Sequence, residues 1–540
     1  MGWRTEGGIS APAAGAQLPV IGGFGWILPD HLRDRAGEAA RIRRDLVEGK
    51  DMSAYAALKT AFHRIACLDE ASAMLGWDAA VMMPAGGAAA RGEQMAVLAG
   101  LSHEALCAPE VKENLAHAEP QTGWDAQNLA LMREAHLRAT VLPKDLVEAR
   151  TQAGQACEAI WRHARQANDF GSVREALTEV VRLTREEAGI LAQALGCSPY
   201  DALMSHYQRG VDAASAGRIF DRYEAFLREA LPQAEALQAQ WSHEELPPGP
   251  YARDIQVELA HGLAKAAGLN FGSARLDVSA HPFCGGTATD IRITTRYDEA
   301  DFCAALTGVL HETGHALYEQ NLPKAWARQP VGAAAGMAVH ESQSLIVEMQ
   351  AVRTDAYLSH LAPLAARAFG KPVTRAGLEH RLRRVRRSFI RVEADELTYP
   401  AHVLLRFRLE QALLSGDLAV ADLPAAWNEG FTGLLGIIPP DDSQGCLQDI
   451  HWFDGLIGYF PSYTLGAMAA AQLMAAARAA LPKLDEHLGQ GDLSPLTSWL
   501  AKQVHSLGSS AGFYEILQAA TGETLNPAYF EAHLRARYLT

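Results

Sequence analysis

Two histidines and a glutamate between residues 311 and 315 have the types and the spacing of a metal-dependent hydrolytic site. His311, Glu312 and His315 fit the pattern H-E-x-x-H. Residues four apart lie on the same face of a helix, so the two imidazoles can bind one metal ion together. Glu312 would then lie beside that ion, where a carboxylate can take a proton from an activated water. The spacing predicts the metal pair and the general base of a hydrolase.

The alternative is a pair of neutral surface histidines on an ordinary helix. An unpaired polar group costs a few kcal/mol when it is buried among apolar residues, and apolar residues flank this pattern: Phe302, Ala305, Leu306, Val309, Leu310 and Leu317. Gly314 also lies in the middle of the predicted helix, where glycine costs about 1 kcal/mol relative to alanine. Both features favour the metal site over the surface pair.

A third metal ligand is expected from a second helix, because hydrolytic zinc sites use three protein ligands and leave one position open. The best candidate is Glu341, in the first turns of a helix predicted to follow Gly336. The helix dipole would also favour a solvated carboxylate at that place, and His340 is a second possible ligand. Two histidines and one glutamate accept Zn, Co or Mn, and zinc is the expected ion.

Composition excludes several classes of protein. The chain has 540 residues, 49% of them hydrophobic, and a net charge of -15. An acidic chain is repelled by nucleic acid and by anionic membranes, and no apolar run approaches the roughly 20 residues that a membrane span needs. The seven cysteines occur singly, with no C-x-x-C pair, which predicts a reducing compartment. We therefore expect a soluble cytoplasmic protein whose partners include neither nucleic acid nor a membrane.

Helical periodicity dominates residues 52–269 and resumes after Glu319. Between these parts, residues 275–279 and 289–297 alternate polar and apolar side chains, and the glycine-containing residues 284–286 are the expected turn. The pattern predicts a small antiparallel hairpin or edge sheet just before the helix that carries the two histidines.

The domain organisation follows from the same patterns. No linker is long enough to divide the core, so residues 52–540 are predicted to form a single domain. Residues 1–51 are rich in glycine, alanine and proline and lack the pattern of a secretory signal. They are predicted to be a mobile extension or the result of a start assigned too early, with Met52 as the natural start.

Six motifs in register make the chain resemble the carboxypeptidase Taq family of metallocarboxypeptidases, and the resemblance covers essentially all of residues 52–540. The motifs are H-P-F from His281, D-x-R-x-T from Asp290, H-E-x-x-H from His311, H-E-S-x-S from His340, I-R-x-x-A-D from Ile390 and G-x-x-Q-D-x-H-W from Gly445. The resemblance implies a mainly α-helical fold in which two helical halves flank a deep cleft, with a small β-sheet beside the metal. The helical periodicity agrees with this expectation.

The resemblance also implies the roles of individual residues. His311, His315 and Glu341 are expected to bind one divalent metal ion, and Glu312 is expected to be the general base. The implied activity removes single residues of broad specificity from peptide C-termini, and the implied assembly is a homodimer. A free C-terminal carboxylate needs a cation that binds it with two hydrogen bonds, and Arg391 is predicted for this task because it lies inside a family motif.

Arg391 ends a basic run that would ordinarily form a solvated helix face. The run consists of Arg381, Arg383, Arg384, Arg386, Arg387 and Arg391. Nucleic-acid binding by this run is not expected, because the chain is acidic and no aromatic residue other than Phe389 is interleaved with the arginines. Arg391 differs because Glu393, Asp395 and Glu396 follow it and could hold it in place. Most of the other arginines are expected at the surface.

Hydrolysis also needs a donor for the oxyanion that develops on the scissile carbonyl. A glycine-rich turn contains His451, Tyr459 and Tyr463. These residues resemble the His and Tyr pair of helical metallopeptidases of the angiotensin-converting enzyme type. Tyr459 is the predicted donor, with His451 as its partner and Tyr463 as the second choice. Packing of these aromatic rings in the core is the alternative.

Other motif residues are given supporting roles. His281 and Arg292 are predicted to line the substrate groove beside the metal. Asp290 and Asp449 are expected to fix neighbouring side chains and not to act on the substrate.

Two other functions compete with this prediction. An oligopeptidase that cleaves internally would share the metal helix but would not need Arg391. A non-catalytic protein that binds metal or peptide would not need Glu312. Both alternatives can be separated from a carboxypeptidase by the products formed and by substitution of these two residues.

Overall fold

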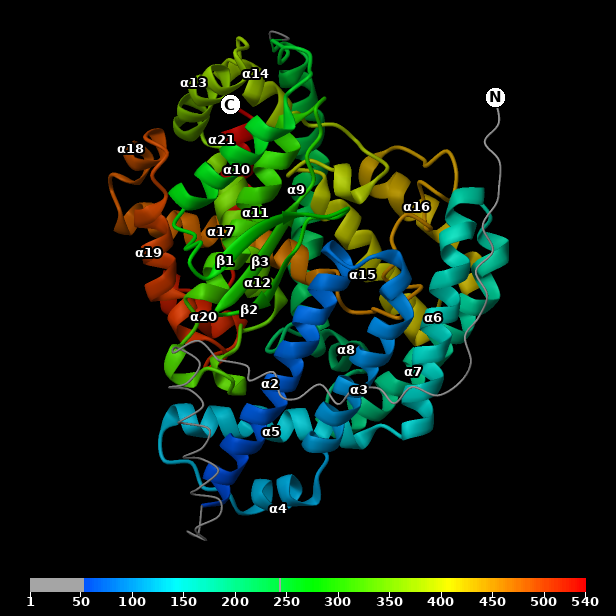
Figure 1. Cartoon of the computed structure of the whole chain (residues 1–540). Helices are drawn as coiled ribbons and strands as arrows, with labels where there is room; N and C mark the ends of the chain where they lie inside the picture. Colours follow the sequence, from blue (N-terminus) through cyan, green and yellow to red (C-terminus); the bar gives the residue numbers. More distant parts are fainter. Residues whose placement is uncertain (1–52, 242–243) are drawn as a thin grey trace, which may run out of the picture. The chain divides into compact units, whose positions relative to one another are not determined.

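Helices make up most of the computed structural model, which describes residues 53–241 and 244–540 (Figure 1). The mainly α-helical class with one small sheet, predicted from the sequence, is confirmed. The predicted extension, residues 1–51, lies outside the described residues. Within the described part of the chain, no helix combines the length and the apolar composition that a membrane span needs.

The α-helices fall into two groups, one before and one after the sheet. The first group consists of α2 (Ala54–Val81), α3 (Ala88–Leu106), α4 (Pro109–His117), α5 (Gly123–Val141), α6 (Lys144–Ala167), α7 (Phe170–Leu195), α8 (Pro199–Tyr207), α9 (Ala213–Gln238) and α10 (Arg253–Ala266). The second group consists of α11 (Phe302–Gln320), α12 (Met337–Leu345), α13 (Asp355–Phe369), α14 (Arg375–Leu382), α15 (Tyr399–Ser415), α16 (Leu423–Leu435), α17 (Pro461–Ala480), α18 (Leu484–Gly489), α19 (Ser494–Gln503), α20 (Phe513–Thr521) and α21 (Ala528–Tyr538).

The sheet has three strands in the order β1-β3-β2: β1 (Ala274–Val278), β3 (Asp290–Thr295) and β2 (Cys284–Thr287). β2 and β3 are antiparallel and are joined by a two-residue turn at Ala288 and Thr289, whereas β1 is parallel to β3. The predicted antiparallel pairing of the first and last segments is therefore wrong. The segment predicted to be the turn is itself the strand β2. The chain passes from β1 at one edge of the sheet to β2 at the other edge, and then enters β3 between them.

The helix α11 lies in the main core, where it packs against α10, α12 and β3. Asp301 caps its first turn by accepting a hydrogen bond from the backbone N–H of Cys303. Its apolar side chains recur at spacings of three and four residues and are almost fully buried: Phe302, Leu306, Val309, Leu310 and Leu317. This burial on several faces fixes the rotation of α11 and therefore the direction of its two histidines.

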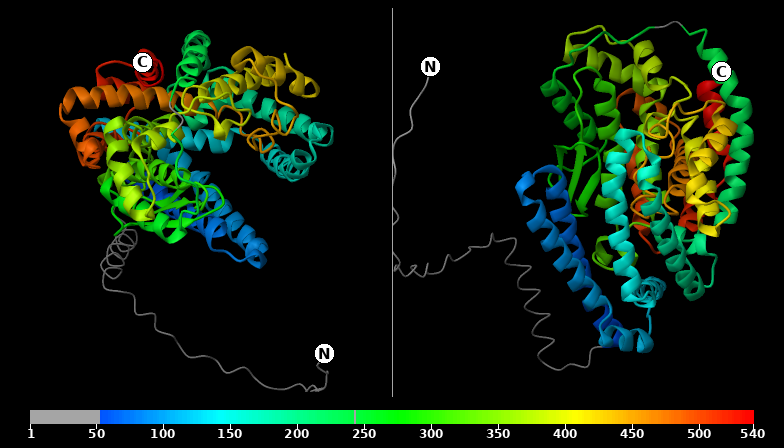
Figure 2. Two further views of the ribbon diagram at one scale, coloured as in Figure 1. Left: turned by 90° about the horizontal axis from the view of Figure 1, so that it is seen from above. Right: turned by 90° about the vertical axis from the view of Figure 1, so that its right-hand side faces the viewer.

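The first helices have a smaller core of their own. Residues of α2, α4 and α5 form a separate buried cluster that includes Leu58, Phe62, Leu115 and Met132. The helices α2 and α3 form a hairpin that extends away from most of the other helices (Figure 2, left). The end of α2 nevertheless reaches the sheet, where it packs against β2.

The backbones of α11 and α12 approach closely at Gly314. A Cβ atom at Gly314 would lie 2.3 Å from the carbonyl oxygen of Gln343 and 2.6 Å from the Cα of Ser344. No side chain fits in this space, so the glycine in the middle of α11 has a packing reason. The contact holds α12, which carries Glu341, against the helix that carries the two histidines.

Alanine at position 314 is expected to destabilise the protein. Its methyl group must push α12 away from α11, and overpacking of this kind costs about 1–3 kcal/mol. Gly308→Ala on the same helix is the matched control, because its Cβ would meet only Thr295 Oγ1 at 3.7 Å. Alanine is more favourable than glycine inside a helix, so Gly308→Ala should be as stable as the wild type, or up to about 1 kcal/mol more stable. Denaturant unfolding measures both, and equal stability of the two variants would contradict the close contact.

Candidate metal centre and active site

Three potential metal ligands meet where α11 and α12 cross. Nε2 of His315 lies 3.5 Å from Oε2 of Glu341, and Nε2 of His311 lies 4.0 Å from the same oxygen. The three ligand atoms all lie within 4.8 Å of one another, so one ion can bind all three. Among residues 53–241 and 244–540, this is the only group of three such side chains. The structure thus brings together the three ligands that the sequence predicted.

The charges around this group favour a cation. Burial lowers the pKa of the His311 imidazole, but the hydrogen bond that it donates to Glu348 and the charges of Glu341 and Glu312 raise it to about 10. Burial raises the pKa of Glu341, but the adjacent histidines lower it to about 2. Oε2 of Glu312 is buried and has no hydrogen-bond partner among the described residues, so it can still accept a hydrogen bond or a proton. Two imidazoles and a carboxylate with this surplus of negative charge fit a divalent metal ion.

Glu348 holds His311 in orientation. Its Oε2 accepts a hydrogen bond from Nδ1 of His311 at 3.0 Å, and its Oε1 pairs with the guanidinium of Arg353. Glu348 lies in a π-helical segment, Ile346–Val352, that continues α12. Such segments are rare and are common at functional sites. The bond at Nδ1 leaves Nε2 of His311 free to face the metal position. In many metal sites a carboxylate orients a histidine ligand in this way.

His315 is held by a second histidine. Its Nδ1 lies 2.6 Å from Nδ1 of His340, and Nε2 of His340 lies 2.9 Å from Oε1 of Glu319. Since Glu319 can only accept, His340 donates from Nε2, and its Nδ1 therefore accepts from Nδ1–H of His315. Both nitrogens of His340 are engaged. His340, the alternative ligand in the sequence prediction, is placed behind the metal position.

The helix α17 holds Glu341 from the opposite side. A Cβ atom at Gly466 would lie 2.9 Å from the Cβ of Glu341 and 3.1 Å from the carbonyl oxygen of Ala338. The absence of a side chain at Gly466 therefore lets α17 pack directly on α12. Gly466, Glu348 and Glu319 were not predicted as parts of the site. A glycine within the alanine-rich sequence of α17 was the only signal for one of them.

A cleft leads from the metal ligands toward Arg391. One cavity of about 630 Å³ is lined by the three ligands and by Glu312, Arg391, Tyr399, Tyr459 and Tyr463. A second cavity of about 780 Å³ begins at His311 and shares Glu348, Arg353, Val392 and Ala394 with the first. The metal position thus lies along a groove with space on both sides.

Arg391 is buried in the wall of this cleft. Its Nε and Nη2 donate to the Asp449 carboxylate, and its Nη1 donates to the Tyr399 hydroxyl at 2.7 Å. A guanidinium has five N–H groups, so two of them have no hydrogen-bond partner among the described residues. Asp449 also pairs with Arg406, and together the three groups carry one net positive charge. Asp449 thus fixes neighbouring side chains, as predicted.

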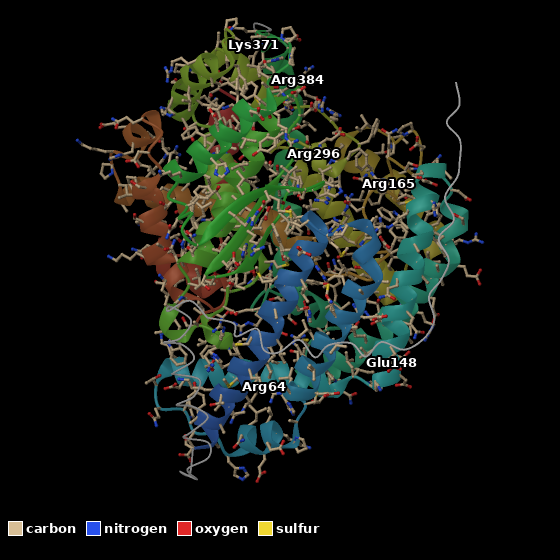
Figure 3. All side chains as sticks on the ribbon, viewed as in Figure 1. Arg64, Glu148, Arg165, Arg296, Lys371 and Arg384 are labelled. Atoms are coloured by element: carbon tan, nitrogen blue, oxygen red, sulfur yellow. The ribbon has the colours of Figure 1, made fainter. Side chains whose placement is uncertain are left out.

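Most of the other arginines of the basic run lie at the surface, as predicted, although they do not share one helix face. The helix α14 ends at Leu382, and Arg383 is buried because it pairs with Glu379 and Asp355. Arg384, labelled in Figure 3, is exposed, as expected for the rest of the run.

Tyr459 and Tyr463 line the cleft together. Their ring centroids are 5.4 Å apart, and the ring of His451 lies 5.3 Å from that of Tyr459. Burial raises the pKa of both phenols, so each keeps the proton that a donor needs. Burial also lowers the pKa of His451 to about 4, although Asp449 opposes the shift. His451 is therefore neutral and lies behind Tyr459, outside the residues that line the cleft.

His281 and Arg292 lie outside both cavities. His281 is exposed, although the next two residues of its motif, Pro282 and Phe283, line the cleft. Arg292 pairs with Asp290 at 2.9 Å, and its guanidinium lies 4.3 Å from the centre of the Trp77 ring. Substrate binding by His281 and Arg292 stays a prediction.

Removal of Glu348 is expected to weaken metal binding. In Glu348→Ala, the His311 ring loses the acceptor that orients it, and loss of such a partner typically lowers metal affinity 10–100-fold. Glu393→Ala is the control, because Glu393 is an exposed glutamate of the same cleft that contacts no metal ligand. Competition with a chelator gives both dissociation constants. A Glu348→Ala value equal to that of the control would show that Glu348 does not orient the ligand.

The sequence of this chain is similar to those of known carboxypeptidases. Residues 57–538 match the family model described as carboxypeptidase Taq (M32) metallopeptidase. "Thermostable carboxypeptidase 1" of Thermus thermophilus is 35% identical over 489 residues, which are 88% of this chain and 96% of the relative. "Carboxypeptidase 1" of Bacillus subtilis is 32% identical over 486 residues, which are 88% of this chain and 96% of the relative.

Solved structures show the same likeness. The metallocarboxypeptidase 1 of Trypanosoma cruzi superposes with a TM-score of 0.89 at 37% identity and covers 91% of this chain and 100% of its own. A carboxypeptidase of Pyrococcus furiosus superposes with a TM-score of 0.86 at 30% identity and covers 91% of this chain and 100% of its own. This chain therefore belongs to the carboxypeptidase Taq (M32) family of metallopeptidases and is a metallocarboxypeptidase.

Proposed function

We propose that this chain uses one bound zinc ion to remove single residues, with broad specificity, from peptides that have a free C-terminus. The observation that carries the proposal is one cleft that holds a metal-ligand group, a buried glutamate and a buried arginine. The first two groups suit hydrolysis, and the arginine suits recognition of a terminal carboxylate. Cobalt or manganese would also fit the ligands.

Glu312 acts as the general base. A divalent metal bound by His311, His315 and Glu341 would supply Lewis-acid activation of the carbonyl group and of water. Burial, opposed by His311, raises the pKa of Glu312 to about 7. A carboxylate of that basicity takes a proton from water and returns it to the leaving amine near neutral pH.

Arg391 and Tyr459 place the substrate around that base. The two N–H groups that Arg391 has left bind the terminal carboxylate, while Asp449 and Tyr399 hold the guanidinium in place. Tyr459 donates its hydroxyl proton to the oxyanion, with Tyr463 beside it as the second donor. His451 supports the Tyr459 ring from behind.

A homodimer in the cytoplasm belongs to the same proposal. The seven cysteines are all free, which supports a reducing compartment. The dimer rests on the family resemblance alone.

Glu312→Gln is expected to keep the metal and to lose hydrolysis. Glutamine has the same shape but cannot accept the proton, so kcat should fall by about 100-fold or more. Metal content by elemental analysis should equal that of the wild type, and Glu393→Gln should retain activity because Glu393 is an exposed glutamate of the same groove. If wild type and variant were equally inactive on blocked dipeptides and longer peptides, the chain would be a non-catalytic binding protein.

Arg391→Lys is expected to reduce discrimination between a peptide and its C-terminally amidated twin. Lysine keeps the charge but offers no two-pronged geometry, so kcat/KM for the free acid should fall by about 100-fold, as for other desolvated charge pairs. The amide, a poor substrate of the wild type, should change little. Arg384→Lys is the control on an exposed arginine. Unchanged discrimination in Arg391→Lys would favour an internally cleaving oligopeptidase.

A further inference from the structure

A buried carboxylate on α15 holds the segment that carries His451 and Tyr459. Glu410 is fully buried. Its Oε1 accepts a hydrogen bond from the indole N–H of Trp452 at 2.9 Å. Its Oε2 accepts from the Tyr200 hydroxyl at 2.7 Å and from the backbone N–H of Gly458 at 3.1 Å.

Two of the three donors to Glu410 are next in sequence to the two residues of the proposed oxyanion site. Trp452 directly follows His451, and Gly458 directly precedes Tyr459. One carboxylate therefore fixes both ends of residues 452–458. If the bond from Gly458 is lost, Tyr459, whose ring lines the cleft, can shift. If the bond from Trp452 is lost, His451, whose ring packs against Tyr459, can shift.

The helix α8 closes the same arrangement from the other side. Gly458 has φ +89°, and a Cβ atom there would lie 2.9 Å from the backbone nitrogen of Met204 on α8. The ring of Tyr207, also on α8, stacks edge-on against Tyr459 at 5.1 Å. Since Tyr200 of α8 donates to Glu410, the carboxylate ties this wall to the Tyr459 segment as well.

The chemistry of Glu410 favours positioning over stability. Its three hydrogen-bond partners are neutral donors, and no ion pair is found for it among the described residues, although the charge of Arg406 also favours its ionised form. Burial raises the pKa of Glu410 to about 7, although its three hydrogen bonds oppose the shift. A buried charge without an ion pair is costly unless hydrogen bonds satisfy it, and all three bonds to Glu410 come from α8 and from the segment beside Tyr459. What the carboxylate provides is an acceptor for three donors at once, from α8 and from both ends of one segment.

We propose that Glu410 is a positioning residue that places the hydroxyl of Tyr459 in the cleft. The inference rests on the oxyanion role proposed for Tyr459. Glu410 itself does not line the cleft, so its effect on turnover must pass through the segment that it holds.

A double-mutant cycle on kcat tests this proposal. Tyr459→Phe should lower kcat by about 100-fold, as removal of an oxyanion donor does elsewhere. Glu410→Gln puts an amide N–H₂ against one of the donors and should lower kcat by about 10-fold or more, with KM changed less than threefold. Because both substitutions act through the Tyr459 hydroxyl, the kcat of the double variant should lie within about threefold of the kcat of Tyr459→Phe alone.

Trp452→Phe provides a second variant in case Glu410→Gln folds poorly. It removes one donor and leaves the carboxylate with Tyr200 and Gly458. Its loss of kcat should be smaller than that of Glu410→Gln and should also vanish in the Tyr459→Phe background. Metal content should match the wild type in every variant.

The outcomes separate the inference from the function on which it rests. If Tyr459→Phe keeps the kcat of the wild type, the oxyanion role fails and this inference fails with it. If Tyr459→Phe is slow but Glu410→Gln multiplies the loss further, the oxyanion role stands and the positioning role of Glu410 is overturned. Unchanged kcat in both Glu410→Gln and Trp452→Phe also overturns it.

Discussion

The contact between the backbones of α11 and α12 at Gly314 is the constraint on which the site depends. His311 and His315 lie on either side of Gly314, and Glu341 lies within one turn of the residues that Gly314 touches. Any side chain at this contact would move the third ligand away from the first two. The second close approach, of α17 at Gly466, prevents α12 from moving in the opposite direction. The metal ligands are therefore set by helix packing and not by a flexible loop.

Charge gives the cleft a direction. Glu312, Glu341 and Glu348 surround the histidines, so this part of the cleft attracts a cation. Further along the same cavity, Asp449 is shared by Arg391 and Arg406 and leaves one net positive charge. In the proposed function, the free C-terminal carboxylate of a peptide binds at the positive end of this cavity, and its last peptide bond lies beside Glu312. A groove with opposite charge preferences at two points selects both the orientation and the end of the chain.

The parts of the site and of the fold that depend on local spacing could be predicted from the sequence. His311, Glu312 and His315 belong to one helix turn, so their pattern alone predicts their roles. Glu341 and Arg391 needed the resemblance, because their positions depend on how distant helices pack. Glu348 could not be predicted, since a π-helical segment changes the direction of its side chain. The helical class was predictable from periodicity, whereas the parallel pairing of β1 with β3 was missed because alternation does not encode strand direction.

The proposed function requires that the activated water cut only the last peptide bond of a peptide. Time-resolved mass spectrometry of one long, unmodified peptide incubated with the metal-loaded protein tests it. The account predicts a ladder of products that lose one C-terminal residue at a time, all with the original N-terminus. Internal fragments that form before any such ladder would contradict it.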